Sequence, residues 1–197
     1  MAGITSINSA VFKKGIIGTD PILTDGVPQI VFVGRSNVGK SSVVNSLTNR
    51  KDLVKVSNKP GKTTELNFFS INNGKAYFVD LPGYGYAEAS PKQKEKLEKL
   101  ILWYLMYSGA RPRMVVLILD MKAGLTAFDE EMIRVLREHE HPYLVVANKA
   151  DKLNQKESSA QLRAIQAAAH EATVATYSAT TATPKERATL LQKILED

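Results

Sequence analysis

The segment that decides the fold is Ile30-Val31-Phe32-Val33-Gly34-Arg35-Ser36-Asn37-Val38-Gly39-Lys40-Ser41-Ser42. Its first four residues are apolar and predict a buried strand, and the residues after it have the apolar spacing of a helix. Gly34 and Gly39 allow the backbone between strand and helix to turn its N–H groups around a phosphate. This G-x-x-x-x-G-K-S pattern predicts that Lys40 reaches the β- and γ-phosphates of a nucleotide and that Ser41 binds Mg²⁺. We therefore expect residues 34–42 to form a nucleotide-binding loop.

The composition is that of a soluble globular protein. The chain has 197 residues, 44% hydrophobic and 23% charged, which suits one α/β domain with flanking extensions. It contains no cysteine, which excludes disulfides, thiolate metal sites and cysteine nucleophiles. No apolar run could cross a membrane and no export signal is recognisable, so we expect a cytoplasmic monomer without membrane contact. The net charge of +6 favours an anionic partner such as nucleic acid, although the same charge can serve solubility alone.

The pattern along the chain predicts an α/β fold. Residues 1–27 contain turn signals and are expected to form an N-terminal extension, and residues 28–197 the nucleotide-binding domain. Residues 66–71 and 76–79 flank Asn72-Asn73-Gly74 and predict an antiparallel hairpin. Further strands are expected at 114–119, 143–147 and 173–177, and helices after residue 42, between Pro91 and Gly109, and at 127–139, 157–170 and 184–195. This order predicts a six-stranded, mainly parallel sheet with one antiparallel edge strand and helices on both faces.

A second motif, Asp80-Leu81-Pro82-Gly83, ends the third predicted strand. The Asp80 carboxylate is expected to hold the Mg²⁺ ion through a water molecule, and the Gly83 N–H group to reach the γ-phosphate. In isolation the same residues could form only a Pro-Gly turn capped by Asp80. Their place in the order of strands favours nucleotide binding, because ligands of such sheets bind beyond the carboxyl ends of the strands.

A third motif, Asn148-Lys149-Ala150-Asp151, follows another predicted strand. The Asp151 carboxylate can accept hydrogen bonds from N1–H and the exocyclic amino group of guanine, whereas adenine has no donor at either position. Lys149 is expected to cover the base plane and Asn148 to tie neighbouring loops together. Backbone N–H groups of Ser178-Ala179-Thr180, preceded by Tyr177, are expected to contact the guanine oxygen. The motif selects guanine, and it would have no role in a small-molecule kinase on the same scaffold.

The segment between the first helix and the hairpin is basic. Five cations, Arg50, Lys51, Lys55, Lys59 and Lys62, stand against one anion, Asp52. Pro60-Gly61 makes regular structure improbable there. We expect this loop to meet the phosphates of a nucleic acid.

Together the motifs resemble those of translation-factor-type GTPases, and in detail those of the EngB family (also called YihA or YsxC) of bacterial ribosome-biogenesis GTP-binding proteins. The resemblance spans about residues 10–195. Its most specific parts are Lys59-Pro60-Gly61-Lys62-Thr63, Leu66-Asn67-Phe68-Phe69 and Asp80-Leu81-Pro82-Gly83-Tyr84-Gly85-Tyr86. It implies the three-layer P-loop GTPase fold, with mobile switch segments at residues 51–65 and 83–90.

The resemblance also implies nucleotide contacts in the first switch segment, from Gly61, Lys62, Thr63, Thr64 and Glu65. Thr63 would close over Mg²⁺ when the γ-phosphate is present and would assist catalysis with Lys40. Thr64 stands where relatives often carry glutamine, which leaves it as the alternative metal ligand, although the spacing after Gly61 favours Thr63. At Asn148 the family frequently has threonine, and asparagine is the commoner form among GTPases.

Two residues bear on the rate of hydrolysis. Tyr84 occupies the position at which many GTPases carry a glutamine that orients the attacking water, so we expect slow intrinsic hydrolysis. Asn37 stands where related GTPases coordinate K⁺, which would make it a catalytic residue. Alternatively, Asn37 only caps the phosphate-binding loop.

The resemblance implies a slow GTPase whose nucleotide state switches its affinity for the large ribosomal subunit or its precursor, with rRNA at the basic loop. It also implies a link to normal cell division and septation. Two alternatives stay open, namely a nucleotide-dependent binding module with negligible turnover and another potassium-dependent GTPase, acting on tRNA modification.

Overall fold

A computed structural model of the chain describes residues 6–54, 65–85 and 90–195. Its strands are β1 (Ala10–Ile16), β2 (Gln29–Gly34), β3 (Leu66–Ile71), β4 (Ala76–Asp80), β5 (Met114–Asp120), β6 (Tyr143–Asn148) and β7 (Val174–Thr176). Its α-helices are α1 (Lys40–Leu47), α2 (Pro91–Met106), α3 (Ala127–Glu138), α4 (Gln155–Ala169) and α5 (Pro184–Leu195). The shorter 3-10 helices are η1 (Pro21–Leu23) and η2 (Ala150–Lys152). The predicted helices and strands are found with small shifts at their ends.

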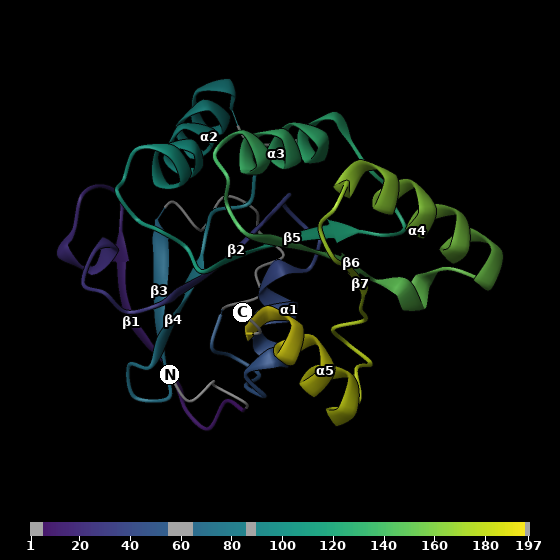
Figure 1. Cartoon of the computed structure of the whole chain (residues 1–197), viewed down its shortest axis with the longest axis horizontal. Coiled ribbons are helices and arrows are strands. Elements are labelled where there is room, and N and C mark those ends of the chain that lie inside the picture. Colours follow the sequence, from purple (N-terminus) through teal and green to yellow (C-terminus); the bar gives the residue numbers. More distant parts are fainter. Residues whose placement is uncertain (1–5, 55–64, 86–89, 196–197) are drawn as a thin grey trace.

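The strands in the described ranges form one seven-stranded sheet, in the order β1-β3-β4-β2-β5-β6-β7. β3 pairs antiparallel with β1 and with β4, and the other neighbouring strands are parallel. Figure 1 shows α2, α3 and α4 on one face of this sheet and α1 and α5 on the other. The predicted α/β fold with three layers and a mainly parallel sheet is confirmed.

The sheet differs from the prediction at its β1 end. β1 lies in the segment that we interpreted as an N-terminal extension, and it pairs with β3 along its length. A register shift between Phe12 and Lys14 places Ala10 and Ile16 in hydrophobic clusters on opposite faces of the sheet. The predicted number of six strands was therefore wrong, because β1 is a seventh strand. The predicted antiparallel edge is present, but β1 forms it by pairing with β3. The domain boundary after residue 27 stays a prediction.

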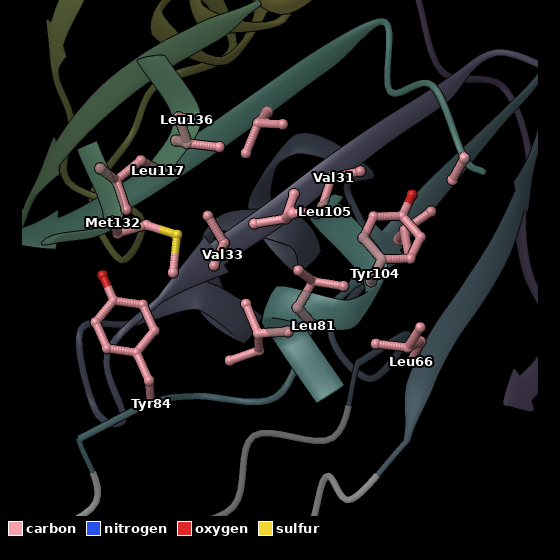
Figure 2. Packing of buried hydrophobic residues seen from close by; sticks show 14 of the residues in the cluster. Val31, Val33, Leu66, Leu81, Tyr84, Tyr104, Leu105, Leu117, Met132 and Leu136 are labelled. Carbon is pink, nitrogen blue, oxygen red and sulfur yellow. The ribbon is translucent and has the colours of Figure 1, made fainter. Parts of the chain in front are cut away.

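Each face of the sheet buries a hydrophobic cluster beneath its helices. On the face covered by α2, α3 and α4, the side chains of Tyr104, Leu117 and Leu136 are fully buried (Figure 2). On the other face, Val43 of α1 and Ile194 of α5 belong to the second buried cluster. These clusters fix the strands, so the loops beyond their carboxyl ends stand on a rigid support.

The carboxyl ends of four neighbouring strands lie at one edge of the sheet. β4 ends at Asp80, β2 at Gly34, β5 at Asp120 and β6 at Asn148. β2 lies between β4 and β5, so the phosphate-binding loop that follows it lies beside the Asp80 motif, and the Asn148 motif follows β6, one strand beyond β5. This is where ligands bind in sheets of this type.

Within the described ranges, no helix has the length and apolarity to cross a bilayer.

Candidate nucleotide-binding site

The loop between β2 and α1 has the backbone geometry that phosphate binding needs. Gly39 is the N-cap of α1 and has a φ of 92°, a conformation that residues with a Cβ rarely adopt. A Cβ at this position would also clash with the side-chain nitrogen of Asn148. Beyond Gly39 the first turn of α1 presents N–H groups that have no partner within the helix, at the positive end of its dipole. The loop is therefore suited to an anion.

Lys40 and Asp80 form a buried ion pair beside this loop. The Lys40 Nζ atom contacts the Asp80 Oδ1 atom, and the two side chains are 8% and 1% exposed. The Asp80 Oδ2 atom is buried and has no hydrogen-bond partner among the described residues. Ser41, which is half-buried, follows Lys40 in the first turn of α1. A buried carboxylate oxygen without a donor and a serine hydroxyl group next to the paired lysine fit a hydrated Mg²⁺ ion.

Asn148 joins the phosphate-binding loop to the segment after β7. Its Nδ2 atom donates to the Val38 carbonyl oxygen at 2.9 Å, and its Oδ1 atom accepts from the Ala179 N–H at 3.1 Å. The side chain is 2% exposed, so both bonds are shielded from water. This is the tie between loops that the sequence predicted. The Ala179 N–H donates to Asn148 in this structure, and its contact with the guanine oxygen stays a prediction.

Lys149 is held by two acceptors. Its Nζ atom donates to the Asn37 carbonyl oxygen at 2.7 Å and to the Asp120 Oδ2 atom at 2.6 Å. Its backbone is left-handed, with a φ of 64°, which is uncommon for a residue with a long side chain. The lysine thus bridges the phosphate-binding loop and the end of β5, in a position suited to covering a flat ligand.

Asp151 presents an ionised carboxylate on η2. The Ser178 hydroxyl oxygen accepts from the Asp151 N–H at 3.0 Å, which orients the residue toward the segment after β7. A hydrogen bond from Lys152 holds the pKa of Asp151 below its ordinary value. Asp151 is therefore ionised at neutral pH, as an unshifted aspartate would also be, and can act as the paired acceptor that guanine requires.

The chain after β4 returns to the phosphate-binding loop. The Ser36 N–H donates to the Tyr84 carbonyl oxygen at 2.8 Å, and a Cβ added to Gly83 would come within 3.0 Å of the Ser36 Cα atom. The Tyr84 side chain turns away from the loop into the core, where it is 3% exposed. Burial, followed by the nearby Asp129 charge, raises the pKa of Tyr84 well above its ordinary value, so its hydroxyl stays protonated.

Comparison with known proteins assigns this set of features to a family. The family model described as "50S ribosome-binding GTPase" matches residues 29–149. A relative from Chlorobaculum tepidum, named "Probable GTP-binding protein EngB", is 42% identical over 183 residues, which are 92% of this chain and 94% of the relative. The chain belongs to the EngB family.

Two further similarities agree with this assignment. An EngB protein of Prosthecochloris aestuarii is 43% identical over 159 residues, 81% of this chain and 82% of the relative. A crystal structure of a probable EngB GTP-binding protein superposes with a TM-score of 0.70 and 26% identity, over 86% of this chain and all of the other. As an EngB-family member, the chain has the α/β P-loop GTPase fold and the GTP-binding GTPase domain of that family. P-loop GTPases bind their nucleotide with Mg²⁺.

Several predicted site residues of this EngB-family chain lie where their side chains serve packing. Leu81 and Pro82 are buried, and Tyr177 is 5% exposed, with its hydroxyl 2.7 Å from the Ser46 hydroxyl of α1. Tyr177 contributes its carbonyl oxygen, which accepts from the Ala150 N–H at 3.2 Å. Glu65 lies against Gly15 of β1, and β3 and β4 separate β1 from β2. The nucleotide contact of Glu65 stays a prediction.

The remaining predicted residues divide between exposed positions and the part of the chain outside the description. Asn37 is exposed, and its side chain makes no hydrogen bond within the described ranges. Ser42 and Ala150 are half-buried. Gly61, Lys62, Thr63 and Thr64 lie outside the described residues, as do the cations Lys55 and Lys59.

Sequence reasoning missed Asp120 and Asp129. Asp120 ends a buried strand, as Asp80 does, so the signal that identified Asp80 was available for it. Asp129 follows Thr126 with the spacing of a helix cap, and its Oδ2 atom accepts from the Thr126 hydroxyl at 2.7 Å. Its second bond, from the Tyr84 hydroxyl at 3.0 Å, joins residues 45 positions apart, and no local pattern predicts it.

Proposed function

We propose that this chain is a GTP/GDP switch that hydrolyses GTP slowly and acts in assembly of the large ribosomal subunit, with a consequent link to cell division and septation. The observation that carries the proposal is the buried Asn148 side chain, bonded on one side to the phosphate-binding loop and on the other to the segment beside Asp151. One residue thereby holds the phosphate half and the base half of the site in register. The description of the matched family as ribosome-binding supports the choice of partner.

The chain's own residues suggest how GTP would be held. Lys40, released from its pair with Asp80, would neutralise charge on the β- and γ-phosphates, and the N–H groups of the loop and of Gly83 would donate to their oxygens. Mg²⁺, held by Ser41 and by Asp80 through water, would supply charge neutralisation, with Thr63 as the proposed ligand from the first switch segment. Thr64 is the alternative ligand.

The position of Tyr84 supports the proposed slow hydrolysis. Its side chain is buried and hydrogen-bonded to Asp129, so it does not replace a glutamine that orients water. Something else must compensate the charge that develops between the β- and γ-phosphates. We propose K⁺ coordinated by Asn37, whose side chain is exposed. Capping of the loop would require a hydrogen bond from this side chain, and it makes none within the described ranges.

This proposal predicts a cation dependence. GTP hydrolysis by the parent should be faster in K⁺ than in Na⁺ at equal ionic strength, and Asn37→Ala should abolish the difference while leaving GDP affinity close to parental. The rates are measured as phosphate release under single-turnover conditions. If the parent hydrolyses GTP equally fast in both salts, Asn37 has no catalytic role of this kind.

The basic segment after α1 is the proposed contact for rRNA phosphates. Arg50 and Lys51 are exposed at its described start, and Asn45 fixes this stretch through its side-chain bonds to the Lys51 carbonyl oxygen and to the backbone of Val54. Lys55, Lys59 and Lys62 continue the charge in sequence. Because Thr63 follows directly, its proposed closure over Mg²⁺ would make the orientation of these cations depend on the nucleotide.

We propose that the chain acts as a cytoplasmic monomer. The test of the rRNA contact is co-sedimentation of the chain with large ribosomal subunits. Binding should be stronger with a non-hydrolysable GTP analogue than with GDP, and should weaken with salt by about 0.7–0.9 log units per tenfold change for each phosphate neutralised. The double variant Arg50→Glu with Lys51→Glu should lose binding and salt dependence. Lys156→Glu with Arg163→Glu, on exposed positions of α4, changes the net charge equally and should bind as the parent does. Equal, salt-insensitive sedimentation in both nucleotide states would contradict the proposal.

The second candidate, a binding module with negligible turnover, is favoured by the buried position of Tyr84. It differs from the slow GTPase in one measurable quantity. Phosphate release that stays at the level of a Lys40→Ala control, with and without large subunits, would support the binding module. Release that subunits accelerate would support the slow GTPase.

A further inference from the structure

A buried polar cluster connects three parts of the chain outside the nucleotide contacts described above. Asp129, in the first turn of α3, is 1% exposed. Its Oδ1 atom accepts from the Tyr84 hydroxyl at 3.0 Å, and its Oδ2 atom lies 3.8 Å from the Arg35 Nη1 atom. The same Oδ2 atom accepts from the N–H and hydroxyl of Thr126, at 3.1 and 2.7 Å. One carboxylate therefore contacts the phosphate-binding loop, the segment after β4 and the start of α3.

The cluster adjoins Gly83, whose N–H group is proposed to reach the γ-phosphate. Arg35 and Tyr84 also meet through their backbones, in an isolated parallel bridge that includes the bond from the Ser36 N–H to the Tyr84 carbonyl oxygen. Gly83, which precedes Tyr84, is packed against Ser36. Tyr84 is anchored twice: its ring packs in the hydrophobic cluster with Leu81 and Met132 (Figure 2), and its hydroxyl is bonded to Asp129. Because Tyr84 is fixed in this way, the N–H group of the preceding Gly83 has little freedom to move.

A buried carboxylate is costly unless it is paired, so this arrangement requires a compensating role. Capping α3 needs only the Oδ2 atom, which serves Thr126. The Oδ1 atom is used for Tyr84 alone among the described residues. The Arg35 Nε atom is itself buried without a hydrogen-bond partner in the described part of the chain, so the guanidinium sits beside Asp129 without being fully satisfied there. The capping bonds therefore do not explain the second half of the cluster.

We infer that Asp129 is a positioning residue for γ-phosphate recognition: through the Tyr84 hydroxyl it fixes the Gly83 N–H against the phosphate-binding loop, and so sets the preference for GTP over GDP. GDP has no γ-phosphate and does not use this N–H. Weakening the cluster should therefore lower affinity for the triphosphate selectively. The inference rests on the proposed GTP/GDP switch and adds to it the residue that tunes the switch.

Tyr84→Phe is the decisive variant, because it removes the bond to Oδ1 and leaves the cap of α3 intact. Affinities for GDP and for a non-hydrolysable GTP analogue are measured by calorimetry with Mg²⁺ present. The ratio of analogue affinity to GDP affinity should fall about fivefold or more, the lower range of coupling between sites. Asp129→Asn should lower the ratio in the same direction. The double variant should be no worse than the stronger single variant, because both changes act on the same interaction.

Thr126→Ala is the matched control, because it weakens the start of α3 and leaves the Tyr84 hydroxyl bonded to Asp129. It should lower the melting temperature and leave the affinity ratio within about twofold of the parent, the tolerance expected for independent sites. The inference is overturned if Tyr84→Phe and Asp129→Asn keep the parental ratio, or if Thr126→Ala changes the ratio as much as they do. Failure of the proposed switch would appear separately, as an inability of the parent itself to bind guanine nucleotides or large subunits.

Discussion

Lys149 shows at the scale of a single residue how the site is assembled from distant parts. Its charged end is bonded to the Asn37 carbonyl oxygen and to the Asp120 carboxylate, which belong to the loop after β2 and to the end of β5. The other oxygen of Asp120 accepts from the N–H groups of Lys122 and Ala123 and so shapes its own turn. Asp120 thus fixes the lysine proposed to cover the base, and it does so from a firmly held loop.

Asp120→Asn separates these two tasks. Asparagine can keep the turn bonds through its single oxygen, but its amide nitrogen then faces the Lys149 ammonium group and cannot accept from it. One charge-assisted bond is therefore lost, at a cost of about 1 kcal/mol or more. GDP affinity should therefore fall about fivefold, measured by titration with a fluorescent GDP analogue, while the melting temperature changes little. Lys122→Gln, an exposed change on the same turn, should have no effect. A parental affinity in Asp120→Asn would mean that the Lys149 pair does not support the base.

The choice of base is predicted to depend on Asp151. In Asp151→Asn the amide nitrogen would face the amino group of guanine, so one charge-assisted bond is lost and affinity for GDP should fall by roughly 1.5–3 kcal/mol. Xanthine carries an oxygen at that position and would accept from the new amide, so affinity for xanthosine diphosphate should rise. Competition between the two diphosphates measures the switch. An unchanged preference for guanine would show that another residue reads the base.

At the scale of elements, β1 raises the question of whether the N-terminal segment is an attachment or part of the folding unit. Ile16 is 7% exposed and belongs to the main hydrophobic cluster, whereas its neighbour Ile17 is 65% exposed. Asn72, at the β3–β4 turn, accepts from the N–H groups of Asn8 and Ser9 and donates to the Ser6 carbonyl oxygen. These bonds anchor the beginning of the described chain to the hairpin and favour an integral role for β1.

The adjacent isoleucines provide a matched test. Ile16→Ala removes buried methyl groups and should lower the free energy of unfolding by about 2 kcal/mol or more. Ile17→Ala makes the same chemical change at an exposed position and should stay within about 0.5 kcal/mol of the parent. Urea denaturation followed by circular dichroism measures both. Similar small losses in the two variants would indicate that β1 is attached to the domain rather than built into it.

The sequence predicted elements well where a periodic pattern was intact and poorly where it was broken. β5 and β6 are continuous apolar runs, and Ser90 and Pro91 mark the start of α2, so these elements were found. β1 was missed because its bulge interrupts the two-residue alternation and because two lysines lie in its middle. The nucleotide motifs were found because each follows a strand end, whereas the Tyr84–Asp129 bond depends on tertiary packing alone.

At the scale of the whole molecule, the nucleotide site connects elements that are distant in sequence. Asn148 links the loop before α1 to the segment after β7, and Lys40 links α1 to the end of β4. A ligand that contacts all of these parts would add bonds between elements that are distant in sequence. Because a nucleotide binds the folded chain and not the unfolded one, its binding free energy adds to the stability of the entire domain.

Saturation with a guanine nucleotide is therefore predicted to raise the melting temperature. At a free GDP concentration 100 times the dissociation constant the stabilisation is about 2.7 kcal/mol, which for a chain of this size corresponds to about 5–10 °C. ATP at the same concentration should give no increase, because adenine cannot pair with Asp151. Lys40→Ala should lose most of the increase in melting temperature because it removes a phosphate contact, and Asp151→Ala should do so because it removes the base contact. The two residues lie on different elements.

Removing Mg²⁺ with EDTA should reduce the increase more for a GTP analogue than for GDP, because only the triphosphate brings the γ-phosphate oxygen to the metal. Equal increases with ATP and GDP would contradict base selection, and an increase that survives both substitutions would place the nucleotide at another site.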